Sequence, residues 1–250
     1  MRDVAFGLEG LFPADPPSLQ ARRTMWEGDL DLFASHSETR GPGRDITFLL
    51  AHDRSATWGI PGAPALRSLI IERNQYAGLY LFSVAPHSLT ALGQAWLIAR
   101  GCPREPILRL PDGLLEPADD ATRALEEQLW SSGDGLAVHD SWSDLPATWM
   151  IVQDPAAEVL PVRVLLEVPD YDAGTYTLTE GAFVSVADAR EWLEGDRDTP
   201  MPQPPGPGFT ERRARAASAR SPHTPDPAAG PCRERPPAGP DASGGPGRSR

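Results

Sequence analysis

Residues 110–129, LPDGLLEPADDATRALEEQL, carry the clearest structural signal in the chain. The second half of this stretch predicts an amphipathic helix over Asp119–Trp130, whose apolar face needs a sheet or another helix to cover it. The apolar residues of this helix recur at steps of three and four: Ala121, Ala124, Leu125 and Leu129. Asp119 or Asp120 is well suited to cap the first turn of the helix.

Strand and helix patterns alternate on both sides of this helix. Apolar or β-branched runs predict strands over Asp45–Ala51, Ala77–Ala85, Pro106–Leu110, Thr148–Val152, Val162–Val168, Tyr176–Leu178 and Ala182–Val186. Helices are predicted over Ser18–Ala34, Pro64–Arg73 and Ala187–Leu193, and the periodicity of Gln94–Arg100 fits either a helix or a strand. The expected fold class is α/β (α+β), a mixed sheet flanked by helices.

The last fifty residues differ in composition from the rest of the chain. Residues 200–250 contain 13 Pro and 7 Gly with few large apolar side chains, which predicts a disordered tail. We divide the remainder into an N-terminal α/β segment of unknown role, residues 1–75, and a domain over residues 76–199.

Charge follows the same division. Residues 1–199 hold 15 Arg and 31 acids, a net of −16, and residues 200–250 hold 8 Arg and 4 acids, a net of +4. An acidic body repels phosphates, so nucleic acid is not the expected partner of the body. The basic tail suits an anionic partner better.

Cysteine content and apolar runs indicate a cytoplasmic protein. The chain has two cysteines, Cys102 in the body and Cys232 in the tail, a pattern that does not suggest a structural disulfide. The N-terminus has acidic residues and no long apolar run, so we expect no secretory signal. No stretch approaches the ~20 apolar residues that a membrane span requires.

One internal similarity attracts attention. Residues 49–58 and 137–149 share the pairs His52-Asp53 and His139-Asp140 and the tripeptide Ala-Thr-Trp. The spacing between the shared elements differs, so we interpret the similarity as coincidence. A metal phosphohydrolase that uses such His-Asp pairs needs further His and Asp partners, and we find no such set.

The turn before the predicted helix resembles the signature of the Nudix hydrolases over about residues 76–195. That signature is G-x5-E-x7-R-E-U-x-E-E-x-G-U, where U is apolar. Gly113 stands at the motif glycine, Glu116 at the frequent glutamate before a proline, and Asp119 at the first motif glutamate. Glu180 lies before the last predicted strand, where the resemblance implies a late acidic residue. The resemblance implies an α/β/α sandwich, a nucleotide or other diphosphate substrate, and Mg²⁺ as cofactor.

The helix that follows lacks most of the carboxylates on which this chemistry depends. Magnesium needs oxygen ligands, and glutamates on one helix face supply them. Without a gap, Gln128, Ser131 and Ser132 stand where the resemblance requires glutamates; a shift by one places Glu127 on the first of them. Glu126 and Glu127 are the remaining candidates for catalysis, although an adjacent acidic pair is more often a solvated helix face.

Three hypotheses follow. The first is a weak or inactive Nudix-like protein that binds a nucleotide or a protein partner. The second is a working diphosphate hydrolase whose substitute acids are Glu116, Asp119, Glu126, Glu127 and Glu180. The third is a non-enzymatic protein-interaction protein unrelated to the Nudix family.

Overall fold

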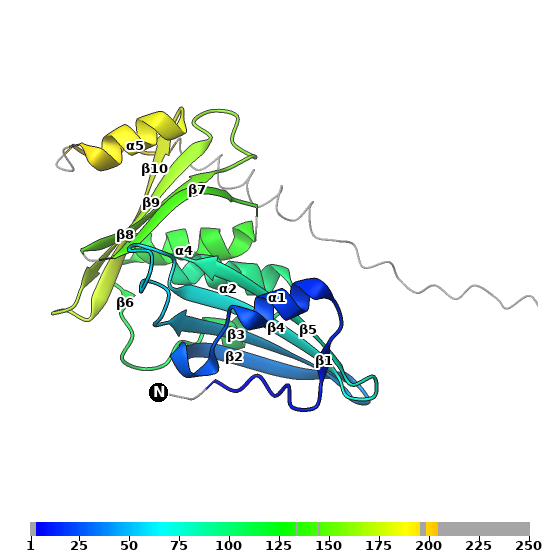
Figure 1. Cartoon of the computed structure of the whole chain (residues 1–250). Helices are drawn as coiled ribbons and strands as arrows, with labels where there is room; N and C mark the ends of the chain where they lie inside the picture. Colours follow the sequence, from blue (N-terminus) through cyan, green and yellow to red (C-terminus); the bar gives the residue numbers. More distant parts are fainter. Residues whose placement is uncertain (1–3, 134, 145, 196–198, 205–250) are drawn as a thin grey trace, which may run out of the picture.

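The computed structural model describes residues 4–133, 135–144, 146–195 and 199–204. It confirms the expected fold class: the protein is an α+β fold with two mixed sheets of five strands each, and five α-helices in its described part (Figure 1). None of the described helices is long and apolar enough to cross a membrane.

The first sheet has the strand order β1-β5-β4-β3-β2. Strand β1 runs parallel to β5, and all other neighbours are antiparallel. Its elements follow one another as β1 (Phe12–Pro13), α1 (Pro16–Arg23), the 3₁₀ turn η1 (Glu27–Asp29), β2 (Leu30–Gly41), β3 (Arg44–Asp53), β4 (Leu66–Asn74), β5 (Leu79–His87) and α2 (Thr90–Ala99).

The second sheet repeats this plan with the order β6-β10-β9-β8-β7. Again the first short strand is parallel to the last, and the other neighbours are antiparallel. After the connecting helix α3 (Arg104–Leu108) come β6 (Glu116–Pro117), α4 (Asp120–Ser132), β7 (Ala137–Asp144), β8 (Ala147–Gln153), β9 (Val162–Asp170), β10 (Thr175–Phe183) and α5 (Val186–Glu194).

The chain therefore contains two copies of one unit, which we call unit 1 (residues 4–99) and unit 2 (residues 109–194). Strands β4 and β5 and helix α2 begin 96 residues before β9, β10 and α5. Between residues 66–97 and 162–193, eight of the 32 pairs are identical: Arg67/Arg163, Leu69/Leu165, Ala77/Ala173, Gly78/Gly174, Tyr80/Tyr176, Ala91/Ala187, Trp96/Trp192 and Leu97/Leu193.

The first helix of each unit is capped and tied to its sheet in the same way. Pro-Ala-Asp precedes both helices, at residues 13–15 and, 104 residues later, at 117–119. Asp15 accepts a hydrogen bond from the backbone N–H of Ser18 at 2.7 Å, and Asp119 accepts one from Thr122 at 2.7 Å. The hydroxyl oxygens of Ser18 and Thr122 in turn accept backbone N–H bonds from β5 and β10. These shared hydrogen bonds fix the angle of each helix on its sheet.

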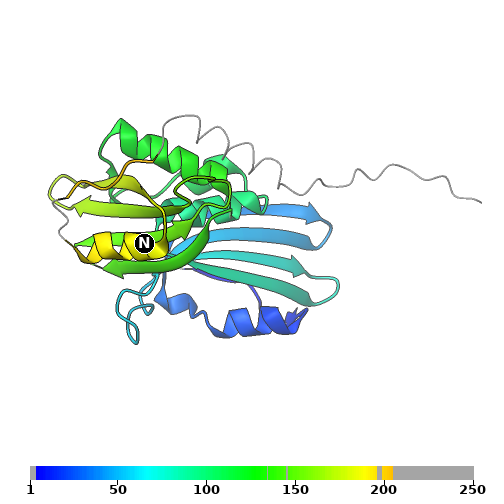
Figure 2. The ribbon, with the colours of Figure 1, turned by 90° about the horizontal axis from the view of Figure 1, so that it is seen from above.

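The helices form layers around the two sheets. Helix α1 covers one face of the first sheet, and α2 with α3 covers the other. Helices α4 and α5 cover opposite faces of the second sheet, and α2 packs against α4 between the sheets (Figure 1). Figure 2 shows α1 on the side of the first sheet away from α2 and α4.

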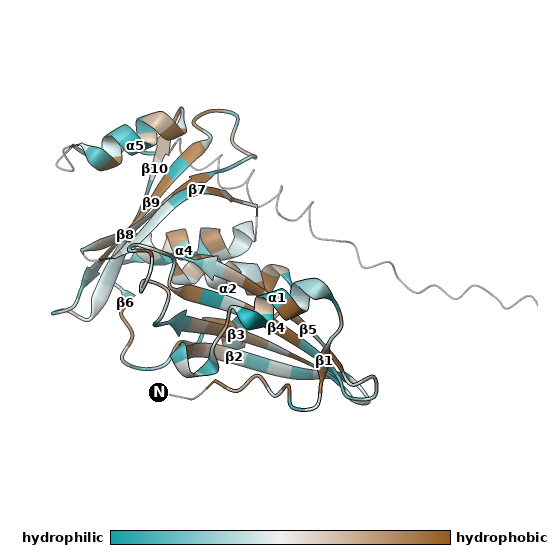
Figure 3. Cartoon of the chain, in the orientation of Figure 1, coloured by the Kyte–Doolittle hydropathy of each residue, from teal (hydrophilic) through white to brown (hydrophobic). Residues whose placement is uncertain are grey.

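Position in these layers explains why the two closing helices differ in composition. Helix α2 lies in the middle, and Leu92, Gln94 and Ala95 are buried. The equivalent positions on the outer helix α5 are Asp188, Arg190 and Glu191, which are exposed. Figure 3 shows teal, hydrophilic segments along α5. A polar outer face is what a terminal repeat requires.

Most predicted elements lie close to observed ones, and three predictions are wrong. Pro64–Arg73 is the buried strand β4, Pro106–Leu110 overlaps helix α3, and the helix predicted over Ser18–Ala34 ends at Arg23. Strand β4 is buried on both faces, so its apolar run lacks the alternation typical of a half-exposed strand. Residues 30–34 belong to β2, and Tyr176–Leu178 lies within β10. Of the strand predicted over Ala182–Val186, only Ala182 and Phe183 belong to β10, and Val186 begins α5.

Two expected boundaries also differ from the structure. The division at residues 75 and 76 falls in the hairpin that joins β4 to β5, so it does not separate two domains. The body also continues past Pro200: Met201 packs against the cluster under α5, and Pro202 accepts a hydrogen bond from Ala182 at 2.9 Å. The predicted disordered tail lies almost wholly in residues 205–250, outside the described residues.

Candidate ligand-binding site

A cavity of about 540 Å³ lies beside α4 in unit 2. Its wall comes from four parts of the chain. The connecting segment 108–117 forms one side, and α4 forms another through Arg123, Ala124, Glu126, Glu127 and Trp130. Gln94 of α2 and Tyr176 of β10 complete the lining. We call this space the α4 cavity.

The wall of the α4 cavity holds a buried carboxylate. Glu126 is only 7 % exposed, and the Tyr176 hydroxyl donates a hydrogen bond to its Oε1. Burial raises the pKa of Glu126, against the opposing effects of the Tyr176 hydrogen bond and the nearby Arg123. Burial, followed by the hydrogen bond to Glu126, also raises the pKa of Tyr176.

A second carboxylate lies behind the first. Glu167 on β9 is half-buried, and burial together with the charge of Glu126 raises the pKa of Glu167 to about 7. Two carboxylates that interact in this way hold their charge at a free-energy cost near neutral pH. A cation in the cavity would offset that cost.

The aromatic part of the wall is held in place by hydrogen bonds. Trp130 Nε1 donates to Gln94 Oε1 at 2.7 Å, and Gln94 Nε2 donates to the Ile107 carbonyl at 3.1 Å. The guanidinium of Arg104 lies 5.2 Å from the Trp130 ring centroid and 3.8 Å from a carboxylate oxygen of Glu127. The rim of the α4 cavity therefore already accommodates one guanidinium group.

The structure brings some of the predicted site residues together and separates others. Gly113, Glu116, Glu126 and Glu127 all line the α4 cavity, and Gly113 has a φ of +90°, which favours glycine at this turn. Asp119 is the cap of α4, the structural alternative to a metal ligand. Glu180 lies away from the cavity, with its Oε1 3.2 Å from Arg163 Nε.

The arrangement does not fit the magnesium site that the resemblance implies. Among the described residues, no group of three or more His, Cys, Asp or Glu side chains is placed to hold a metal ion. Asp119 is held at the helix cap and Glu180 by Arg163, and neither of them lines the α4 cavity. These carboxylates point to separate partners rather than to a common centre.

Sequence reasoning missed Tyr176, Trp130 and Glu167 as site residues. Glu167 lies in the run VLLEVPD. The pattern of this strand does not show that Glu167 lies close to Glu126. The signal that could have identified it is the repeat. The equivalent of Glu167 in unit 1 is Ile71, a fully buried core residue, and the equivalent of Glu126 is Arg22.

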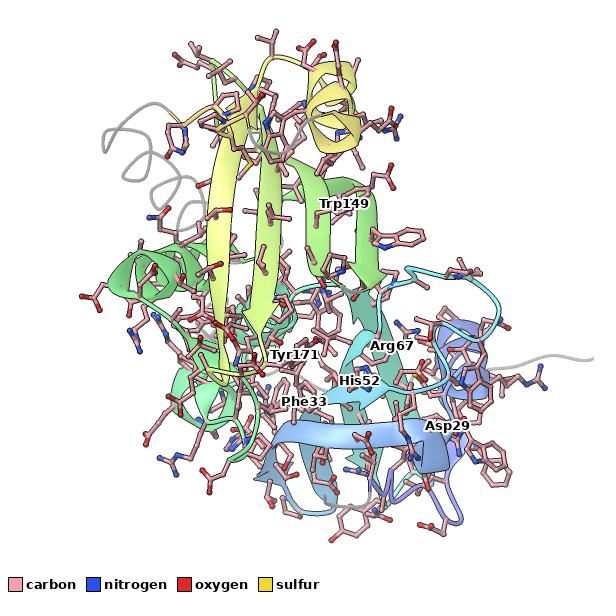
Figure 4. All side chains as sticks on the ribbon, turned by 90° about the vertical axis from the view of Figure 1, so that its left-hand side faces the viewer. Asp29, Phe33, His52, Arg67, Trp149 and Tyr171 are labelled. Atoms are coloured by element: carbon pink, nitrogen blue, oxygen red, sulfur yellow. The ribbon has the colours of Figure 1, made fainter. Side chains whose placement is uncertain are left out.

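A second cavity, of about 800 Å³, lies along β2 on the other side of the segment 110–114. Phe33 of β2 lines it and stacks on His52 at 6.1 Å between ring centroids (Figure 4). Burial lowers the pKa of His52, and Arg67 is paired with Asp53 at 3.0 Å. The buried acids of this neighbourhood, Asp31 and Asp53, already face Arg54 at 3.8 Å and Arg67 at 3.0 Å. Glu126 instead accepts a hydrogen bond from the neutral Tyr176 hydroxyl, so the α4 cavity is the stronger candidate for binding a cation.

No protein-family model, curated protein or solved structure matches this chain.

Proposed function

We propose that this protein is a non-enzymatic binding protein, and that the α4 cavity receives a cationic group, either a protonated amine or a guanidinium. The observation that carries the proposal is the buried Glu126 carboxylate in the wall of an open cavity. A carboxylate in that position is stabilised when a cation enters and forms charge-assisted hydrogen bonds with it.

The comparison of the units supports a binding role over a structural one. At the positions of Glu126 and Glu167, unit 1 has Arg22 and the buried Ile71, and its fold is the same. The fold therefore does not require two carboxylates there. Residues that break the packing rules of their own fold are most often found at functional sites.

The charges around the cavity favour a cation over an anion. Four acids line it, Asp112, Glu116, Glu126 and Glu127, against two cations, Arg123 in the lining and Arg104 at the rim. Arg123 itself donates to the Pro117 carbonyl at 3.1 Å and lies 3.5 Å from Asp120. The net charge of −16 over residues 1–199 also attracts basic ligands over longer distances.

Diphosphate binding or hydrolysis, the activity implied by the Nudix resemblance, stays a prediction. A diphosphate in the α4 cavity would face the same four acids. Magnesium would have to screen them, and no described set of residues is placed to bind it. The same experiment can test both ideas if a diphosphate with magnesium is included among the ligands.

The test is calorimetric titration of the full chain with ethylguanidinium, n-butylammonium, acetate, and ADP with magnesium, at constant ionic strength and pH 8. We expect the two cations to bind and the anions not to bind. Glu126→Gln should weaken cation binding by about tenfold or more, which is ~1.4 kcal/mol. Glu105→Gln is the matched control, because Glu105 is an exposed acid outside the cavity.

Two results would contradict the proposal. One is that Glu126→Gln and Glu105→Gln weaken cation binding equally. In that case the loss of affinity would come from the change in net charge and not from the cavity. The other is binding of ADP with magnesium in preference to either cation, which would favour the diphosphate prediction.

A further inference from the structure

In unit 1, a segment of the chain itself fills the space next to the first helix. Phe6, in the non-helical segment 4–8, is fully buried in the core cluster that includes Ile71 and Tyr80. Its ring lies 5.1 Å from that of Phe82, and the guanidinium of Arg22 lies 5.0 Å above it. The segment 4–8 thus inserts one side chain between helix α1 and its sheet.

The residues around Phe6 have equivalents at the α4 cavity. Arg22 corresponds to Glu126 and Tyr80 to Tyr176, and both Glu126 and Tyr176 line the cavity. Ile71 corresponds to Glu167, which interacts with Glu126. By this equivalence, the α4 cavity is the place in unit 2 that Phe6 takes in unit 1.

The chain segment that should fill this place in unit 2 is bound elsewhere. Residues 4–8 correspond to residues 108–112. Ile107 is buried in the cluster between α2, α3 and the first sheet, and Leu108 and Leu110 pack against the same cluster. The segment is therefore held on unit 1 and only forms the outer wall of the α4 cavity.

We propose that the α4 cavity takes an extended segment of a partner protein, which inserts a lysine or arginine side chain as the segment 4–8 inserts Phe6. This inference rests on the proposed function and names the source of the cation. Unit 1 shows that this kind of space accepts an extended segment with one anchoring side chain. The exchange of Arg22 for Glu126 selects a basic anchor in place of an aromatic one.

The backbone hydrogen bonds that hold the inserted segment in unit 1 have no equivalent in unit 2. The backbone N–H of Phe6 donates to Glu27, and its carbonyl accepts from Arg73. The equivalents of Glu27 and Arg73 are Ser131 and Pro169, which cannot make the same ionic hydrogen bonds. The partner segment must therefore be recognised mainly through its inserted side chain and its contacts with the apolar connecting segment.

The test uses short peptides whose sequences follow residues 4–8, with the residue at the place of Phe6 varied. The acetylated and amidated peptides VARGL, VAKGL, VAFGL and VAEGL are titrated into the full chain and into a chain truncated after Pro204, beside N-acetylarginine amide. We expect VARGL and VAKGL to bind about tenfold or more tightly than VAFGL and VAEGL, and about tenfold or more tightly than N-acetylarginine amide. A double variant, Glu126→Arg with Glu167→Ile, restores the unit 1 residues and should reverse the preference toward VAFGL.

The outcomes separate this inference from the proposed function. Equal affinity for VARGL and N-acetylarginine amide would overturn the inference and leave a small-cation site. Equal affinity for VARGL and VAFGL would overturn the selection of a basic anchor. A tenfold gain in VARGL affinity on truncation would assign the site to the chain's own arginine-bearing tail instead of a partner. If neither the peptides nor N-acetylarginine amide bind, both the inference and the proposed function fail.

Discussion

Unit 1 and unit 2 have the same strand order and the same capped first helix, but they differ in the space between that helix and its sheet. In unit 1, Phe6 closes the space and Ile71 lines it with apolar surface. In unit 2, the space is open, and Glu126 and Glu167 bring two carboxylates into its neighbourhood. One copy of the fold is thus closed by its own chain, whereas the other keeps a cavity and carries the free-energy cost of buried charge.

The largest expected effect comes from opening the closed copy. Phe6→Ala removes a fully buried ring from unit 1 and should lower the free energy of unfolding by about 3–5 kcal/mol. Leu110 holds the equivalent position in unit 2 but is only partly buried, so Leu110→Ala should cost less, ~1–2 kcal/mol. Urea denaturation of both variants measures the difference. If Phe6→Ala and Leu110→Ala lower the free energy of unfolding equally, the two segments pack equally well in their units. That result would contradict the contrast between a closed unit 1 and an open unit 2.

The second largest effect is expected in unit 2, where a substitution should raise the free energy of unfolding and not lower it. The pKa of Glu167 is raised to about 7, above its usual value of 4.5, so the fold favours the protonated carboxyl. Stability should therefore fall as the pH rises from about 4.5 to 7. Glu167→Gln removes this fall and should raise the free energy of unfolding at pH 8 by about 1–3 kcal/mol.

Thermal melts between pH 5 and pH 8 check this prediction. Glu191→Gln, on the exposed face of α5, is the control for a general change of net charge. Glu167→Gln could instead lower the stability at pH 8, or have the same effect as Glu191→Gln. Either result would mean that the ionised Glu167 carboxylate does not destabilise the fold, and that replacing Ile71 of unit 1 by an acid has no free-energy cost.

Part of this comparison could be predicted from the sequence. The cap at Asp119 and the burial of Leu125 and Leu129 follow from local spacing, and the structure has both. The prediction that Ala121 and Ala124 belong to the buried face is wrong, since both are exposed. Local patterns predict a helix and its main buried face well because both depend on neighbours three or four residues apart.

The repeat and the cavity could not be predicted in the same way. The offset between equivalent residues changes from 104 at the first helix to 96 at β4 and β9, so no fixed period appears in the sequence. The shared His-Asp pairs are not equivalent in the fold, because His52 lies near the end of β3, whereas His139 lies in β7. The pairing of Glu126 with Glu167 depends on tertiary contacts across 41 residues, which a single sequence does not contain.

A matched pair of tryptophans tests whether the cavity wall is specifically built. Trp130 lies in the last turns of α4, and its equivalent Trp26 follows α1. Trp26 is 73 % exposed, whereas Trp130 donates to the buried Gln94. Trp130→Phe should cost about 1–3 kcal/mol, because it leaves the Gln94 oxygen without its donor. Trp26→Phe should stay within about 0.5 kcal/mol. Denaturation curves that show similar costs would mean that Trp130 is not a specifically positioned wall residue.

The smallest expected effect concerns the outer face of unit 2. Gly181 corresponds to Ala85 in unit 1, and a Cβ at Gly181 would lie 2.2 Å from Met201 Cγ. The glycine therefore makes room for residues 199–202, which pack against β10 and α5. We expect truncation after Thr199 to lower the free energy of unfolding by ~1 kcal/mol, a drop of about 2–4 °C in Tm, and truncation after Pro204 to leave it unchanged.

Gly181→Ala should be destabilising by a similar amount in the chain that ends at Pro204 and nearly neutral in the chain that ends at Thr199, since the two changes remove the same contact. If Gly181→Ala costs the same in both truncated chains, Met201 does not depend on the missing side chain, and the difference from Ala85 has another origin.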